Sequence, residues 1–140
     1  GYPPAEKNPK KAIISKTGIT VEFDDENKVL TAVTPSKNTL ILSDKDKKVT
    51  LKDENNNSIF MSSDGITIKS AKRITLQADQ NVEIKGAQGI KVASSGGDVE
   101  TTGNNIKETA NMQFAAKGSM TAQVQGGTEL VLKGAMVMIN

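Results

Sequence analysis

Charged residues in a few short stretches are the first candidates for chemistry in this 140-residue chain. Lys69, Lys72 and Arg73 form a small basic group that could contact phosphate groups. No aromatic residues are interleaved with these cations, and base stacking on aromatic rings is what single-stranded nucleic-acid sites use. The pattern therefore favours a solvated outer face, and we expect no nucleic-acid partner.

Two other stretches match calcium-binding motifs only in part. The run Asp44–Lys48 departs from the EF-hand loop at its fifth position and at its glycine, which favours a charged turn. Gly96-Gly97-Asp98 lacks the rest of the calcium β-roll nonapeptide, which favours a bulge. The chain contains no histidine or cysteine, and no serine lies beside a plausible base. We therefore predict no catalytic residue, no metal site, no cofactor and no enzyme activity.

One group of carboxylates depends on the direction in which its side chains point. Asp98, Glu100 and Glu108 occupy positions that are apolar elsewhere in a repeat of eight residues. If copies of the chain met along an axis, these like charges would recruit a proton or a cation. A one-residue slip at Gly96-Gly97 would turn Asp98 and Glu100 outward. It would not turn Glu108, which alternates in step with Ile106, so Glu108 is the candidate for an axial ion or water site.

The repeat itself begins at Gly65, and we call its eight-residue blocks octads. The second position of the octads is apolar in nine of ten blocks, with Asp98 as the exception. The second and fourth positions alternate with polar residues, which predicts a short strand with one buried face in each octad. Small residues near the sixth and seventh positions predict sharp corners. The residues predicted to face the core are Ile66, Ile68, Ile74, Leu76, Val82, Ile84, Ile90, Val92, Ile106, Phe114, Val124, Leu130 and Leu132.

Residues 13–64 are organised differently. Alternating apolar residues predict strands at 19–23, 29–33, 40–42, 49–51 and 59–61, separated by polar turn clusters roughly ten residues apart. We therefore expect a linker over 1–12, a β-meander over 13–64 and the octads over 65–140. Helix is hard to place anywhere, and no stretch approaches the roughly 20 apolar residues of a membrane helix or a signal-peptide core.

A repeat as short as the octad buries a core only when copies of it stack. Three octads could form one coil of a single-chain solenoid. Alternatively, three chains could each supply one face per layer and wind about a common axis. Each octad offers only two or three inward side chains, and no capping helix is visible, which favours the trimer. The predicted fold is an all-β, intertwined triple-stranded β-helix preceded by a hairpin meander.

Three stretches of the chain resemble a known family. They are NPKKAIISKTG continuing into ITVEFDDENK, then KKVTLKDENNNSIFMSSDGITIKSAKRITLQADQNVEIKGA, and the ending LVLKGAMVMIN. Together they are similar to the C-terminal spike of VgrG, the valine-glycine repeat protein of type VI secretion systems, and to the needle of contractile phage tails. The similarity covers nearly all of the 140 residues.

This resemblance implies a homotrimeric, membrane-puncturing spike at the tip of a contractile injection apparatus. A PAAR-repeat protein would cap its blunt end, and secreted effectors would be its cargo. It would join the tail tube through a hub and upstream domains that the sequence lacks, and would touch the target membrane transiently. The resemblance also implies assembly in the bacterial cytoplasm, without a signal peptide, before secretion or injection into a target cell.

The end of the chain is its most apolar stretch. We expect the tip that binds the PAAR-repeat protein to be Met136, Val137, Met138, Ile139 and Asn140; the alternative is a last core layer closed by its own side chains. The alternative function is a trimeric phage or pyocin-like tail fibre, an adhesin that binds a host surface. Such a fibre would end in a head with exposed aromatic residues, whereas this chain is expected to end in a strand.

Overall fold

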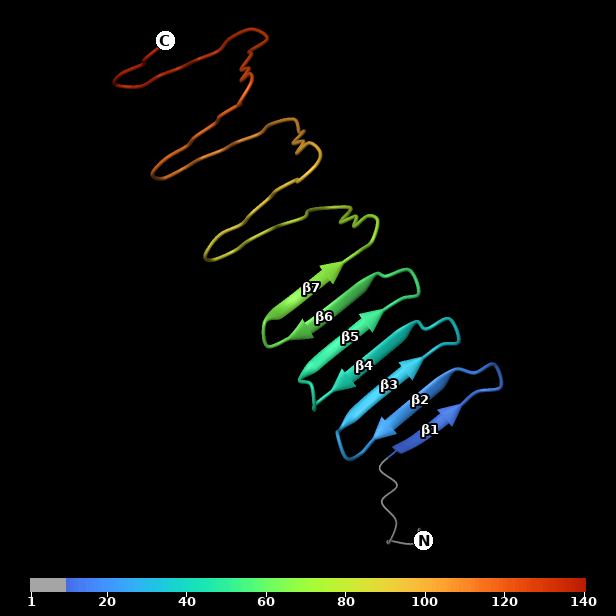
Figure 1. Cartoon of the computed structure of the whole chain (residues 1–140). Coiled ribbons are helices and arrows are strands. Elements are labelled where there is room, and N and C mark those ends of the chain that lie inside the picture. Colours follow the sequence, from blue (N-terminus) through green and yellow to red (C-terminus); the bar gives the residue numbers. More distant parts are fainter. Residues whose placement is uncertain (1–9) are drawn as a thin grey trace, which may run out of the picture. The chain divides into compact units, whose positions relative to one another are not determined.

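A computed structural model describes residues 10–140, which are all-β and contain no helix. Most of the predicted linker, residues 1–9, lies outside the described residues. The chain divides into two units, Gly1–Lys85 and Gly86–Asn140. The first unit contains seven antiparallel strands in one open sheet (Figure 1). The strands are β1 (Lys10–Ile14), β2 (Thr20–Asp24), β3 (Val29–Val33), β4 (Thr39–Ser43), β5 (Lys48–Lys52), β6 (Ser58–Ser62) and β7 (Gly65–Lys69).

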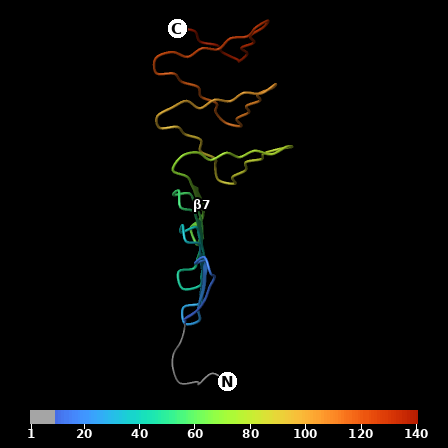
Figure 2. The ribbon, with the colours of Figure 1, turned by 90° about the vertical axis from the view of Figure 1, so that its right-hand side faces the viewer.

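The sheet is a meander, because each strand pairs with the next strand along the chain. Strands β2 to β6 confirm the five strands that alternation predicts, each to within one residue at either end. Sequence reasoning missed β1, whose apolar residues Ala12, Ile13 and Ile14 are consecutive and do not alternate. Figure 2 shows the sheet edge-on as a single layer. Among the described residues, no helix is present that could span a membrane.

The turns reveal a longer repeat than the predicted spacing of ten residues. Ser15, Thr34 and Asp53, which are 19 residues apart, each open a five-residue turn. The main-chain N–H of each donates to the carbonyl of the residue four positions on, at 2.9, 3.0 and 3.1 Å. The side-chain oxygen of each accepts a hydrogen bond from the N–H of that same residue, at 3.0, 3.2 and 2.9 Å. The meander is therefore a repeat of two strands and two turns.

Backbone conformation follows the same 19-residue period. The fourth residue of each five-residue turn has a positive φ, 92° at Gly18, 72° at Lys37 and 65° at Asn56. The left-handed region is sparsely populated by residues other than glycine, although asparagine enters it readily. The turn hydrogen bonds hold Lys37 in this conformation, so local sequence and turn geometry together set the register of each hairpin.

The second unit forms no strand with itself. Its chain winds through successive open turns (Figure 1) and bends sharply once in every octad. The bends fall at the seventh and eighth positions, one residue later than the predicted corners. At Gly96-Gly97, where we predict an inserted residue, the bend is three residues long. The bends of this unit are at residues 87–88, 95–97, 104, 111–112, 119–120, 127–128 and 135.

Glycine at the sixth octad position permits the tightest bends. A Cβ atom on Gly86, Gly118 or Gly126 would overlap the main-chain carbonyl oxygen of the residue three positions on. That oxygen belongs to the backbone and cannot rotate away as a flexible side chain would. The octads with alanine, serine or threonine at this position must bend less closely, because their Cβ atoms need the space.

Substitution of Gly118 tests this account of the bends. In Gly118→Ala the added methyl would overlap the carbonyl oxygen of Thr121, so the bend has to open. Overpacking of this kind costs about 1–3 kcal/mol, and we expect the melting temperature followed by circular dichroism to fall by several degrees. Gly127→Ala is the matched control at the next bend, where an added Cβ meets nothing within 4 Å. Equal melting temperatures for the two variants would contradict the assignment.

No hydrophobic side chain is buried among the residues that the structure describes. The buried side chains are polar, namely Thr39, Ser43 and Thr50, at 7–8% exposure. The chain exposes 14074 Å² of surface. A compact monomer of 14.8 kDa would expose about 7,000 Å², and its unfolded chain about 21,000 Å². The chain by itself therefore leaves its apolar residues without a core.

Candidate interaction surfaces

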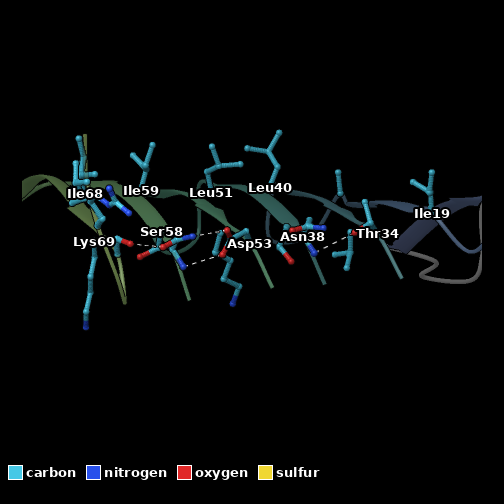
Figure 3. A pocket seen from close by; sticks show the side chains of 18 residues that line it. Ile19, Thr34, Asn38, Leu40, Leu51, Asp53, Ser58, Ile59, Ile68 and Lys69 are labelled. Atoms are coloured by element: carbon cyan, nitrogen blue, oxygen red, sulfur yellow. Dashed lines mark hydrogen bonds between the residues drawn. The ribbon is translucent and has the colours of Figure 1, made fainter. Parts of the chain in front are cut away.

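One face of the sheet carries two rows of apolar side chains, and we call it the apolar face. The Cα register places each member of a row opposite a member on the neighbouring strand. Leu40, Leu51, Ile59 and Ile68 project from the same side of the sheet in Figure 3. The first row is Ile13, Val21, Ala32, Leu40, Leu51, Ile59 and Ile68, and the second is Phe23, Leu30, Leu42, Val49, Met61 and Ile66, with Lys11 at its β1 end.

The opposite face of the sheet is mainly polar and partly covered. Its central row runs from Ala12 through Glu22, Thr31, Ile41 and Thr50 to Phe60 and Thr67. The Lys48 ammonium lies 4.1 Å from the centre of the Phe60 ring and shields it. The three polar side chains that are buried among the described residues, on β4 and β5, also belong to this face. The two faces therefore differ in chemistry: the opposite face is mainly polar and suited to contact with water, whereas the apolar face is uncovered.

A shallow hollow of about 650 Å³ lies on the apolar face, beside the five-residue turns. Its floor includes Leu40, Leu51 and Ile59, and its rim includes Asn38 and Asp53 (Figure 3). The Leu51 side chain is 50% exposed in this hollow. Isolated exposed apolar residues are common on protein surfaces, but contiguous patches that cross a whole sheet mark contact surfaces.

Hydrogen bonds join successive five-residue turns, which all lie at the same end of the strands. Asn38 Oδ1 accepts from the main-chain N–H of Glu54 at 3.2 Å, and Asn57 Oδ1 accepts from the Ser70 hydroxyl at 2.6 Å. The main-chain N–H of Asn57 and then its side chain donate to Asp53, and these bonds lower the pKa of Asp53 below its ordinary value of 3.8. Hydrogen bonds therefore hold the turns at the rim of the hollow in place.

A second aspartate, Asp24, caps a turn at the opposite end of the strands. The Asn27 side chain and then its main-chain N–H donate to Asp24, which lowers the pKa of Asp24 below 3.8. The side-chain bond is 2.9 Å long and the main-chain bond 3.1 Å. Both acidic groups cap turns, and neither lies in a constellation that could do acid–base chemistry.

The predicted core residues are divided between the two kinds of structure. Ile66 and Ile68 lie on β7, where they extend the two apolar rows, and Thr67 and Lys69 lie on the opposite face. The other eleven predicted core residues, from Ile74 to Leu132, follow β7 along the octads and are 51–74% exposed. The described chain brings none of these octad side chains into a core of its own.

Glu108 and the basic group are exposed to solvent. Among residues 10–140, no three acidic, histidine or cysteine side chains are placed to hold a metal ion, so one copy of the chain does not assemble the predicted axial site at Glu108. Lys69 and Arg73 both border the hollow, although the Lys69 side chain points away from Ile68 toward the other face of β7 (Figure 3). The Lys85–Glu83 ion pair, 3.5 Å long, is exposed on both sides and contributes little.

The predicted tip is also bare. Met136, Val137, Met138 and Ile139 are 78%, 53%, 85% and 89% exposed. These are four adjacent apolar side chains with no covering residue from the described chain. An apolar strand end with an open edge is an aggregation hazard unless something pairs with it.

Sequence reasoning missed the apolar face as a contact surface. It predicted the strands, but it placed the intermolecular core only in the octads. The available signal was the 19-residue spacing of Ser15, Thr34 and Asp53, which fixes equal strands and turns and so stacks the apolar residues into straight rows. No protein-family model matches the chain, and a search of curated proteins finds no match.

Proposed function

We propose that this chain is a structural protein that works as one strand of a homotrimeric, triple-stranded β-helix. The observation that carries the proposal is the unpaired main chain of the octads that follow β7. Between residues 71 and 140, no main-chain N–H donates to a main-chain carbonyl of the chain. Main-chain donors and acceptors that are shielded from water need partners, and extended segments with an apolar side find them in neighbouring strands.

The geometry of the octads supports partners from other chains over partners from the same chain. A single-chain solenoid would pair each coil with the next, and residues 71–140 contain no such pairing. Two further chains, wound in parallel, would supply the missing hydrogen bonds to both edges of the octads that follow β7. They would also cover the apolar second and fourth positions, which are more than half exposed in the single chain.

The surface area supports the same proposal. The chain exposes roughly twice the surface of a compact protein of its mass, an excess of about 7,000 Å². Obligate oligomers bury about 2,000–5,000 Å² or more in each interface. An excess of this size is in the range that two intimate neighbours would remove, whereas a transient partner would cover only a small part of it.

The resemblance to VgrG and phage needles gives the proposed trimer its role. We propose a membrane-puncturing spike of a contractile secretion apparatus, whose tip at Met136–Asn140 docks a PAAR-repeat protein and, through it, effectors. Hub and tube would lie upstream, and the spike would form in the bacterial cytoplasm before injection. A rod with main-chain hydrogen bonds along its whole length and no lateral edge suits mechanical loading.

A trimeric tail fibre that binds a host surface is the second candidate. A trimeric fibre would be built from the same octads, so their unpaired main chain is equally expected in a fibre and in a spike. The composition favours the spike, because an adhesive head would present exposed aromatic residues and only 3% of the residues are aromatic.

The oligomeric mass in solution tests the proposal. Sedimentation velocity and light scattering should give three times the 14.8 kDa of the chain, with no monomer at micromolar concentration. The assembly should also resist dodecyl sulfate without boiling, because each chain has to be unthreaded from the other two. A folded monomer of 14.8 kDa, with the circular dichroism spectrum of a β-protein, would refute the intertwined helix and favour a single-chain solenoid.

A further inference from the structure

The apolar face of the β1–β7 sheet is the largest surface that the proposed function leaves unexplained. It is more than a row of isolated residues, since one apolar row crosses all seven strands and the second crosses β2 to β7. The exposed fractions of Phe23, Leu42, Leu51 and Ile68 are 40%, 43%, 50% and 56%. The opposite face, by contrast, holds the buried Thr39, Ser43 and Thr50 and the shielded Phe60. A sheet of this kind needs a second layer on one side only.

We propose that the apolar face is a self-association surface through which three copies of the chain join before their octads pair. The inference rests on the proposed trimer and adds an order of assembly to it. Its occupant is the same face of two further copies, closed into a ring by a threefold axis. Ile66 and Ile68 belong both to the rows of the sheet and to the first octad. The apolar face is therefore continuous with the proposed trimer interface of the octads, which supports the same two partner chains as its occupant.

The sheet can form before the partners arrive. All of its pairings join strands that are consecutive along the chain, and side-chain caps at Ser15, Thr34 and Asp53 close its five-residue turns. Local contacts of this kind form quickly and at low entropic cost. The octads from residue 71 onward have no main-chain partner in their own chain, so they can become ordered only after three chains have met.

Register is the physical reason for this order. The second octad position is apolar in nine of ten blocks, so moving one chain by eight residues loses little more than one layer of contacts. Octads that met first would therefore accept several nearly equal registers. The sheet does not offer several nearly equal registers, because its repeat is 19 residues long and the whole sheet contains only seven strands. Sliding one sheet by a full repeat would uncover two strands and their four apolar side chains, at about 1.5–3 kcal/mol each.

Two aspartate variants of the full chain distinguish association that begins at the sheet from association that begins at the octads. Leu51→Asp places a carboxylate in the centre of the apolar face, whereas Val124→Asp places one at an inward position of the eighth octad. We expect Leu51→Asp to abolish the trimer and to leave residues 71–140 open to protease. We expect Val124→Asp to remain a trimer by light scattering, with proteolysis confined to the octads around residue 124.

Lys52→Asp is the matched control, because it puts the same side chain on the next residue of β5 but on the opposite, exposed face. It should remain a trimer with the proteolysis pattern of the wild type. Loss of the trimer in Val124→Asp, or a trimer in Leu51→Asp, would overturn the inference while leaving a trimeric wild type intact. A wild-type dimer would place two sheets face to face and would overturn the threefold occupant. A wild-type monomer would instead refute the proposed function.

Discussion

Replacing Ile84 by aspartate is expected to lower the melting temperature of the trimer by more than about 10 °C. Ile84 is the fourth residue of the third octad and is 67% exposed in the single chain. In the proposed trimer it faces the axis, so the variant would place three carboxylates in one layer. Each would be desolvated without a partner, which costs several kcal/mol per group. Thermal unfolding followed by circular dichroism measures the effect.

Glu83→Asp and Glu83→Thr are the controls for Ile84→Asp, one residue earlier in the same octad. Glu83 faces outward in the proposed trimer and makes only an exposed ion pair with Lys85, whose loss changes stability by less than about 1 kcal/mol. Both control variants should melt within a few degrees of the wild type. If Ile84→Asp and Glu83→Asp have equal melting temperatures, the assignment of inward and outward positions is wrong.

Deleting Met136–Asn140 is expected to abolish capture of a PAAR-repeat protein and to leave the trimer intact. The deletion removes four adjacent apolar side chains that are 53–89% exposed and that nothing in the described chain covers. Methionine side chains adapt to partners of different shape, which suits a threefold surface that meets a partner without exact threefold symmetry. A pull-down with a recombinant PAAR-repeat protein from the same organism, and the mass of the truncated assembly, measure the two outcomes.

Met138→Asp and Met120→Asp refine this experiment without shortening the chain. Both methionines are almost fully exposed, at 85% and 97%, but only Met138 lies in the predicted tip. Met138→Asp should weaken binding at least about 100-fold, because the centre of an interface carries most of its energy. Met120→Asp should bind as the wild type does. Undiminished binding by the trimeric truncation would place the partner elsewhere on the rod.

The sequence by itself determined the all-β class and most of the meander. Alternation at 19–23, 29–33 and 49–51 identified strands because one face of each strand is apolar and the other polar. The octads and their bends were also predictable, because an apolar second position recurs in nine of ten blocks and a small sixth position in every complete block. These features depend on neighbours within a few residues, and such neighbours are visible in a sequence.

Only the tertiary structure decided how the local elements combine. Pairing registers such as Ala32 with Leu40 and Leu51 with Ile59 stack the apolar residues of the sheet into two rows on one face. Those registers depend on turn hydrogen bonds at Ser15, Thr34 and Asp53, whose 19-residue period is hidden among many polar residues. The strand β1 escaped prediction because Ala12, Ile13 and Ile14 do not alternate. Its pairing with β2, and not its own sequence, makes it a strand.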